Sequence, residues 1–157
     1  MGKLQLISGF AVLVCVGFFA THFFSRTSEQ ADVFAYGEFA GVSLKLEFAT
    51  TTAAREKGLS ERTLIPEGYG MLFVFPQDSR YGFWMKDTLV PLDIFWLDST
   101  GKVVSIHEGV TPESYPSVFY PSQPARYVLE TAAGFGALHA VATGTPLLLK
   151  SWPIVSN

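Results

Sequence analysis

The chain is poor in the residue types that most often carry catalysis or hold metals. Cys15 is the only cysteine among 157 residues, so neither an intrachain disulfide nor a cysteine-based metal site can form. Cys15 also lies in an apolar run, where a thiol stays neutral and is a poor nucleophile. The histidines outside that run, His107 and His139, show no HExxH or similar spacing. The sequence therefore predicts no metal and no cofactor.

Positive charge is scarce as well. Charged residues make up 16% of the chain, and the formal net charge is -3. Past residue 31 there are nine Lys or Arg against thirteen Asp or Glu, a balance of 9 − 13 = −4, with no basic stripe. We therefore expect no nucleic-acid partner. The chain also has no Gly-x-Ser-x-Gly elbow, and no serine stands in a convincing strand-turn-helix context for a hydrolase nucleophile.

What is present first is a long apolar run, from Leu4 to Phe24. At about 1.5 Å per residue such a helix spans roughly 30 Å, the thickness of a bilayer core. Lys3 before the run favours a cytoplasmic N-terminus. A cleavage site ending at Ala20 would place the bulky Phe18 at its −3 position, which disfavours processing.

These features divide the chain into three parts. Residues 1–25 are expected to form a transmembrane anchor or uncleaved signal, residues 26–35 a linker, and residues 36–157 a β domain. The expected location is the inner (cytoplasmic) membrane, with a single span and the domain facing the periplasm or exterior. The alternative is secretion to the periplasm after cleavage.

The rest of the chain reads mainly as strands. Residues 42–48 alternate apolar and polar positions, as in a half-buried strand. Further strands are expected at 70–75, 81–85, 92–97, 103–108, 125–130 and 145–150, with short helices at 52–57, after a Thr cap, and within 134–142. A long Pro- and Tyr-rich loop at 111–124 suggests a lid or contact surface. With no βαβ rhythm, the fold class is mainly β: a compact antiparallel barrel or sandwich with two short helices.

Charged residues within one of the most apolar segments mark the candidate site. Lys86, Asp87 and Asp93 stand among aromatic and aliphatic neighbours in residues 82–98. Burying an isolated ion is costly, so these residues either form a satisfied polar network or line a binding site. Trp84 beside them fits a ring-binding wall or ordinary packing.

Three further ionisable residues belong to the same candidate set. Arg55 precedes the expected helix end, while Arg126 and Glu130 share one face of a strand and could bracket a third group. As a functional set, these residues could orient a small polar ligand; as a structural set, they fix strand register or close the barrel.

Several of these motifs together resemble one family. The segments 55–62, 70–75, 83–88, 91–94, 127–130 and 133–134 occur in the order and spacing of domain of unknown function 192, over about residues 40–150. That family usually has Asn at the position of Asp87. The resemblance implies a compact β-barrel-like domain, often exported, and no established activity.

The sequence favours binding over catalysis. The first hypothesis is a membrane-anchored periplasmic interaction domain, an accessory or stabilising subunit that meets a membrane-protein partner. The second is a protein that binds a small ligand such as a saccharide or envelope material. The third is an envelope hydrolase with paired carboxylates, which would use Asp87 with Asp93 or Glu130.

Overall fold

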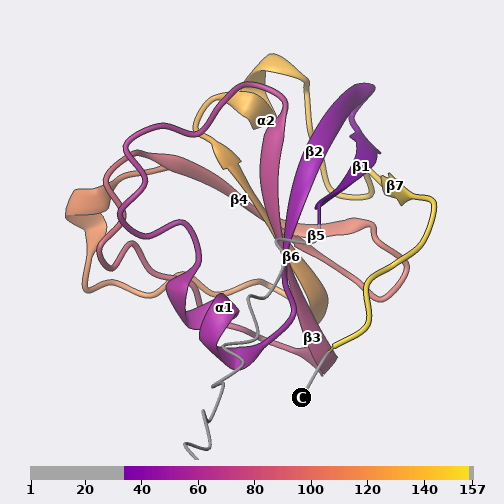
Figure 1. Ribbon diagram of the computed structural model, residues 1–157, viewed down its shortest axis with the longest axis horizontal. Helices are drawn as coiled ribbons and strands as arrows, with labels where there is room; N and C mark the ends of the chain where they lie inside the picture. The colour runs from indigo at the N-terminus through magenta and orange to yellow at the C-terminus, as the bar shows by residue number, and fades with distance from the viewer. Residues whose placement is uncertain (1–33, 156–157) are drawn as a thin grey trace, which may run out of the picture.

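The computed structural model describes residues 34–155, which form one strongly curled sheet with two short helices (Figure 1). The strand order is β5-β4-β6-β3-β2-β1-β7. The elements, in chain order, are β1 (Phe34–Phe39), β2 (Val42–Ala49), α1 (Thr52–Lys57), β3 (Tyr69–Ser79), β4 (Leu92–Leu97), β5 (Val103–Val110), the 3₁₀ turn η1 (Pro112–Ser114), β6 (Ala125–Ala132), α2 (Phe135–Leu138) and β7 (Leu147–Leu149). The mainly β prediction with two short helices is confirmed.

Most neighbouring strands run antiparallel, as expected, with one exception. Strands β2 and β3 are parallel, with Leu46 opposite Gly70 and Phe48 opposite Leu72. A parallel pair needs a crossover, which here runs through α1 and the connection that follows it. The expectation of no βαβ unit is therefore wrong for this part of the chain. The crossover places α1 over one face of the sheet.

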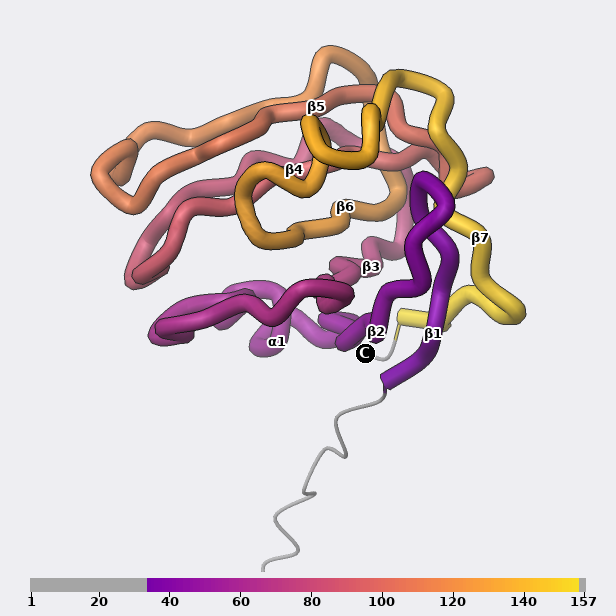
Figure 2. The backbone as a smooth tube through the Cα atoms, turned by 90° about the horizontal axis from the view of Figure 1, so that it is seen from above, coloured from indigo at the N-terminus to yellow at the C-terminus, as the bar shows by residue number. Residues whose placement is uncertain are grey.

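The two outer strands of the sheet approach each other at one end. The segment before β5 and the segment before β7 exchange backbone bonds: Val103 N donates to Thr145 O (3.0 Å), Gly144 N to Val103 O (2.8 Å) and Leu147 N to Gly101 O (2.9 Å). Figure 2 shows β7 running beside β1, with which it pairs. All seven strands belong to one curled sheet. Of the two architectures expected, a barrel-like one is therefore closer than a sandwich.

Alternating side chains give the sheet two apolar cores. On the inner face, Leu44, Leu46, Leu72, Val74, Phe95, Leu97 and Leu129 pack together with Phe39 and Leu147. On the outer face, Met71, Phe73, Ile94, Trp96 and Val128 pack against Leu59, Ile65, Phe83 and Met85 from the connecting segments. This explains why residues 70–75 are apolar at every position, because successive side chains enter opposite cores. The alternation predicted at residues 42–48 is confirmed.

Of the individual helices and strands predicted from the sequence, some are confirmed and one is wrong. Helix α1 begins and ends as predicted: Thr51 Oγ1 accepts a hydrogen bond from Ala54 N (3.1 Å), and Gly58 follows the last turn with φ 50°. The expected strand at 81–85 is wrong, because only Phe83 forms a bridge, to Phe119. Phe83 and Met85 of this segment belong to the outer core, and Tyr81 packs against it. Strand β1 was not predicted from the sequence.

The expected membrane anchor and most of the expected linker lie outside the described residues. Among residues 34–155, no helix combines the length and the apolar character that a membrane crossing requires.

Candidate ligand-binding site

Glu130 is the most unusual residue of the outer face. It lies in the middle of β6, opposite Met71 of β3 on one side and Ile94 of β4 on the other. Its exposed fraction is 5%. Strand alternation puts Glu130 on the same face as Val128, and therefore into the outer core beside Phe73. A carboxyl group is thus placed on the apolar floor of this face.

The carboxyl of Glu130 has no counterpart there. Within residues 34–155 it forms neither an ion pair nor a hydrogen bond, and its burial raises its pKa from 4.5 to about 8. Desolvation alone causes this rise, because it disfavours the charged form of a carboxyl. At neutral pH Glu130 is therefore protonated and has an O–H to donate. A carboxyl whose pKa is strongly shifted in this way is a candidate for a functional residue.

Above Glu130 lies a cavity of about 280 Å³, which we call the Glu130 pocket. Its walls come from α1 and the residues just after it, from β3, and from the segment between β3 and β4. Five aromatic side chains line it: Phe73, Phe75, Tyr81, Phe83 and Trp84.

These aromatic rings hold one another in place. Phe75 and Tyr81 stack with 3.6 Å between their centroids, and Phe73 meets Phe83 edge-on at 4.8 Å. Trp84 is 53% exposed and stands at the outer part of the wall. Such mutually packed rings form a preorganised apolar surface, the usual lining of a small-molecule site.

Arg55 ties the pocket wall to the sheet. Its Nη1 donates to Thr50 O (2.7 Å) and to Val74 O (3.0 Å), and its Nη2 donates to Thr52 Oγ1 (3.1 Å). The guanidinium also lies 5.3 Å from the centroid of the Phe75 ring. These contacts fix the start of α1 against β3. Arg55 lines the pocket as a positioned cation whose backbone contacts are structural.

The segment around Lys86 forms the opposite wall. Lys86 is exposed and lines the pocket, and its carbonyl accepts a hydrogen bond from Ser60 Oγ (3.2 Å). Asp87 is exposed and does not line the pocket; its φ is 55°, and its carbonyl accepts from Glu61 N (2.8 Å). Asp and Asn are the non-glycine residues that best tolerate such a backbone. The role of position 87 is therefore to turn the chain.

Asp93 lies away from the pocket, on the other face of β4. It is fully buried and accepts backbone hydrogen bonds from Gly109 N (2.7 Å) and Gly136 N (2.8 Å). Asp93 thereby joins β4 to the end of β5 and to α2. Asp93 therefore has the structural role that was one of the two alternatives. Lys86, Asp87 and Asp93 do not form one cluster, because Lys86 lines the pocket, Asp87 lies in an exposed turn and Asp93 is buried on the other face of β4.

Arg126 is also engaged elsewhere. Its Nε lies 2.6 Å from Asp78 Oδ1 in an ion pair that is partly exposed. It does not line the pocket with Glu130, although both residues belong to β6. Of the seven candidate residues, the pocket brings together four: Arg55, Trp84, Lys86 and Glu130.

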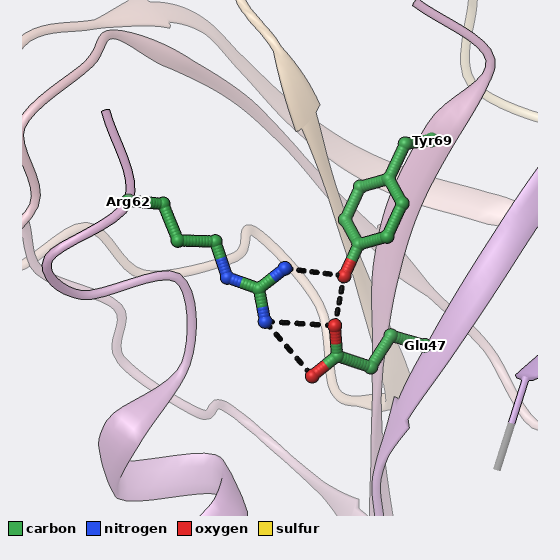
Figure 3. A network of polar contacts seen from close by, with 3 residues as sticks. All are labelled: Glu47, Arg62 and Tyr69. Carbon is green, nitrogen blue, oxygen red and sulfur yellow. Dashed lines mark hydrogen bonds and ion pairs between the residues drawn. The ribbon is translucent and has the colours of Figure 1, made fainter. Parts of the chain in front are cut away.

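A second polar cluster was not expected from the sequence. Arg62 Nη2 lies 2.9 and 2.7 Å from the two carboxylate oxygens of Glu47, and its Nη1 donates to Tyr69 Oη (2.6 Å); Tyr69 in turn donates to Glu47 (Figure 3). Burial, together with the hydrogen bond to Glu47, raises the pKa of Tyr69. The cluster ties the connection after α1 to the parallel strands β2 and β3.

Glu47 and Arg62 also line a wider depression of about 820 Å³. The charged side chains of Glu47 and Arg62 are paired with each other there. The apolar lining includes Phe34 and Ile154, near the two ends of the described chain. The smaller Glu130 pocket is therefore the stronger candidate, because it alone of the two contains a buried polar side chain without a partner. In residues 34–155, no three His, Cys, Asp or Glu side chains gather as metal ligands would.

The comparisons with known proteins agree with the fold. Residues 36–149 match the family domain of unknown function 192, described as an uncharacterized ACR, and the chain belongs to this family. Among curated proteins, no relative matches.

Two solved structures are similar. One, from Sinorhizobium meliloti and described as a candidate transcription regulator, is 33% identical with a TM-score of 0.66, over 71% of this chain and 88% of its own. The other, a protein of unknown function from Novosphingobium aromaticivorans, is 26% identical with a TM-score of 0.69, over 76% of this chain and 85% of its own. Both likenesses cover most of the folded domain.

Proposed function

We propose that this protein is a membrane-anchored domain that binds a small ligand in the Glu130 pocket. The observation that carries the proposal is the carboxyl of Glu130, which lies at the base of an aromatic-lined cavity, has no partner within the described residues and is accessible from the cavity. Its oxygens reach the cavity, so a ligand in the pocket can supply the hydrogen-bond partner that residues 34–155 do not provide. Segments 55–62, 70–75 and 83–88, which carry the family resemblance, each contribute residues to this pocket.

Catalysis by paired carboxylates has less support. The carboxylate of Asp93 accepts hydrogen bonds from two backbone N–H groups, and Asp87 is exposed and does not itself line the pocket. Asp87, the common member of both proposed pairs, therefore has neither Asp93 nor Glu130 beside it in the pocket. Binding needs only the groups that the pocket already holds.

Trp84 provides a direct test of ligand binding. Because Trp84 is 53% exposed, Trp84→Ala should change the free energy of unfolding by less than about 1 kcal/mol. The variant should nevertheless bind ligands of the pocket about tenfold more weakly, because this part of the aromatic wall is removed. A fragment library screened by ligand-observed NMR against the full-length chain measures this. Tyr36→Ala is the matched control, since Tyr36 is 69% exposed and outside the pocket. Hits that survive Trp84→Ala unchanged, or no hits at all, would contradict the proposal.

A second candidate function, docking on a membrane-protein partner, is favoured by a group of exposed apolar side chains near the pocket. Tyr115, Val118 and Tyr120 from the 111–124 loop are 47%, 37% and 58% exposed. Val118 and Tyr120 pack over Gly82, where an added Cβ would lie 2.6 Å from each of them. Exposed aromatic residues gathered in one place are typical of an interaction surface.

We infer that the domain faces the periplasm or exterior, held by an anchor at residues 4–24, and docks its partner through that loop. Full-length protein extracted gently from its native membranes should co-isolate one partner in stoichiometric amount. The double variant Tyr115→Ser and Tyr120→Ser should lose that partner, because both contacts lose their apolar area. Mass spectrometry of the isolated material reports the partner and the N-terminus together. A processed, partner-free protein would reject both the anchor and the docking role.

We do not propose that this chain regulates transcription, the role in the description of the Sinorhizobium structure. Residues 34–155 hold nine Lys or Arg against twelve Asp or Glu, 9 − 12 = −3, so the domain offers no general attraction to nucleic acid.

A further inference from the structure

The charge around the Glu130 pocket is opposite to that of the domain. Three cationic side chains line it, Arg55, Lys57 and Lys86, against the single carboxylate of Glu56. With Glu130 protonated, the lining sums to 3 − 1 = +2, whereas residues 34–155, counted in the same way, sum to 9 − 11 = −2. A local positive potential in an acidic domain attracts anions and repels cations.

The charged and neutral groups stand at different depths. Lys57 and Lys86 are exposed, whereas Glu130 is 95% buried, being 5% exposed. The aromatic rings lie between these two levels because they rise from the floor at Phe73 to the exposed Trp84. A ligand that fills the pocket therefore meets a hydrogen-bond donor at its inner end, apolar rings along its body and positive charge at its outer end.

The size of the cavity limits the ligand further. A cavity of about 150 Å³ is enough to admit benzene, and this one is about 280 Å³. A single ring with one substituent at each end fits such a volume. A carboxylate at the inner end would have to lose its hydration on an apolar floor, which is costly, so the charge belongs at the mouth.

Resting on the function proposed above, we propose that the ligand is a small organic anion: a planar or apolar body with an anionic group at one end and a neutral hydrogen-bond acceptor, such as a carbonyl or ring nitrogen, at the other. The O–H of Glu130 donates to the acceptor, the rings hold the body, and Lys86, Lys57 and Arg55 meet the charge.

The groups that face Glu130 across the pocket determine how binding responds to pH. They are Arg55, Glu56 and Lys57 from α1 and Tyr81 and Lys86 from the segment after β3, while its strand neighbours Met71 and Ile94 do not titrate. Burial raises the pKa of Tyr81, so this side chain stays neutral at pH 9. Lysine and arginine ordinarily remain charged there. Between pH 6.5 and 9, loss of the Glu130 proton is therefore the change that weakens binding.

Four matched probes test the chemical class: 4-acetylbenzoate, its isostere 4-isopropylbenzoate without an acceptor, the neutral 4-acetylbenzamide and the cationic 4-acetylbenzylamine. They are titrated into full-length protein in lipid nanodiscs, with empty nanodiscs as the blank, and followed by ligand-observed NMR. We expect 4-acetylbenzoate to bind about tenfold more tightly than the other three. Its affinity should fall about tenfold from pH 6.5 to 9, because a carboxyl of pKa about 8 is then about one-tenth protonated.

Variants separate the contributions of the two ends. Glu130→Gln should bind a few-fold more weakly with no pH dependence, and Glu130→Met should no longer distinguish the acetyl probe from the isopropyl probe. Lys86→Met should weaken the anionic probes and spare the amide, with the exposed Lys150→Met as control. Thermal unfolding of each variant confirms that it folds.

The outcomes distinguish this inference from the function beneath it. Tighter binding of the benzylamine, or equal binding of acid and amide, would overturn the anionic class while leaving a ligand site that Trp84→Ala still weakens. Binding of none of the probes, in a protein whose fragment screen also gives no hits sensitive to Trp84→Ala, would overturn both.

Discussion

Replacing Glu130 by glutamine should make the folded domain more stable at neutral and mildly alkaline pH. The pKa of Glu130 is raised by burial from 4.5 to about 8, so the folded state holds a proton that the unfolded chain releases. The stability that accompanies this proton is complete below pH 4.5 and is lost as the pH rises through 4.5 to 8. At pH 7 the loss amounts to about 3 kcal/mol, from 2.5 pKa units at about 1.4 kcal/mol each.

Glutamine has nearly the same shape and does not titrate. Glu130→Gln should therefore be no more stable than the parent at pH 4.5. At pH 8, where the parent has lost about 4 kcal/mol, the variant should be about 3 kcal/mol more stable, after about 1 kcal/mol for burying the amide. Thermal unfolding of the full-length protein between pH 4.5 and 9 measures the difference. Glu56→Gln, at an exposed position of the same pocket, should leave the pH profile unchanged. A parent protein equally stable at pH 5 and pH 8 would show that Glu130 is ionised in the fold and has found a partner.

Replacing Asp93 by alanine should have the opposite and larger effect. Both carboxylate oxygens of Asp93 accept backbone hydrogen bonds inside the fold, from Gly109 and Gly136. Alanine leaves these two N–H groups without an acceptor, and the side chain that met them is 0% exposed. We expect a loss of about 3–5 kcal/mol in the free energy of unfolding.

Asp98 offers a matched control for this experiment. It too accepts backbone hydrogen bonds, from Thr100 N (2.8 Å) and Lys102 N (3.0 Å), but in a partly exposed turn where water can replace it. Asp98→Ala should cost only about 1 kcal/mol. The midpoint of thermal unfolding measures the loss of stability in each variant. Equal losses for the two would mean that Asp93 is not a buried hydrogen-bond acceptor between β4, β5 and α2.

How far the sequence predicts this fold depends on whether the signal is local. Helix α1 was predictable because its cap, Thr51, and its terminating residue, Gly58, stand beside it in the chain. The alternation of β2 was equally local. The parallel pairing of β2 with β3 was not predictable in this way, since it is set by packing of the crossover against Phe73 and Met71 on the outer face.

The site divides along the same line. Ionisable and aromatic residues within the motifs made Glu130, Lys86, Trp84 and Arg55 candidates, and the structure places these four around one pocket. The same signal also marked Asp93, whose charge is satisfied by backbone groups at positions 109 and 136, far along the chain. Whether a buried carboxyl has a partner depends on such distant contacts, so sequence alone could not separate Asp93 from Glu130.

The left-handed backbone at Asp87 also revises one sequence argument. The family that this chain belongs to usually has Asn at this position, and a neutral amide there could be taken as functional. With φ at 55° and the side chain exposed, the shared property of Asn and Asp is tolerance of this conformation. The charged side chain at this position is exposed and does not line the pocket.

The backbone hydrogen bonds between residues 101–103 and 144–147 also affect the tendency of the domain to associate with other copies of itself. An open sheet presents unpaired N–H and C=O groups that can recruit another chain, and β5 and β7 would be such edges here. By hydrogen-bonding to each other at one end, the segments before these strands shorten both edges at once. Strand β7 thus opposes self-association through the sheet edges. Without it, both β1 and β5 would be open to the addition of a strand from another chain.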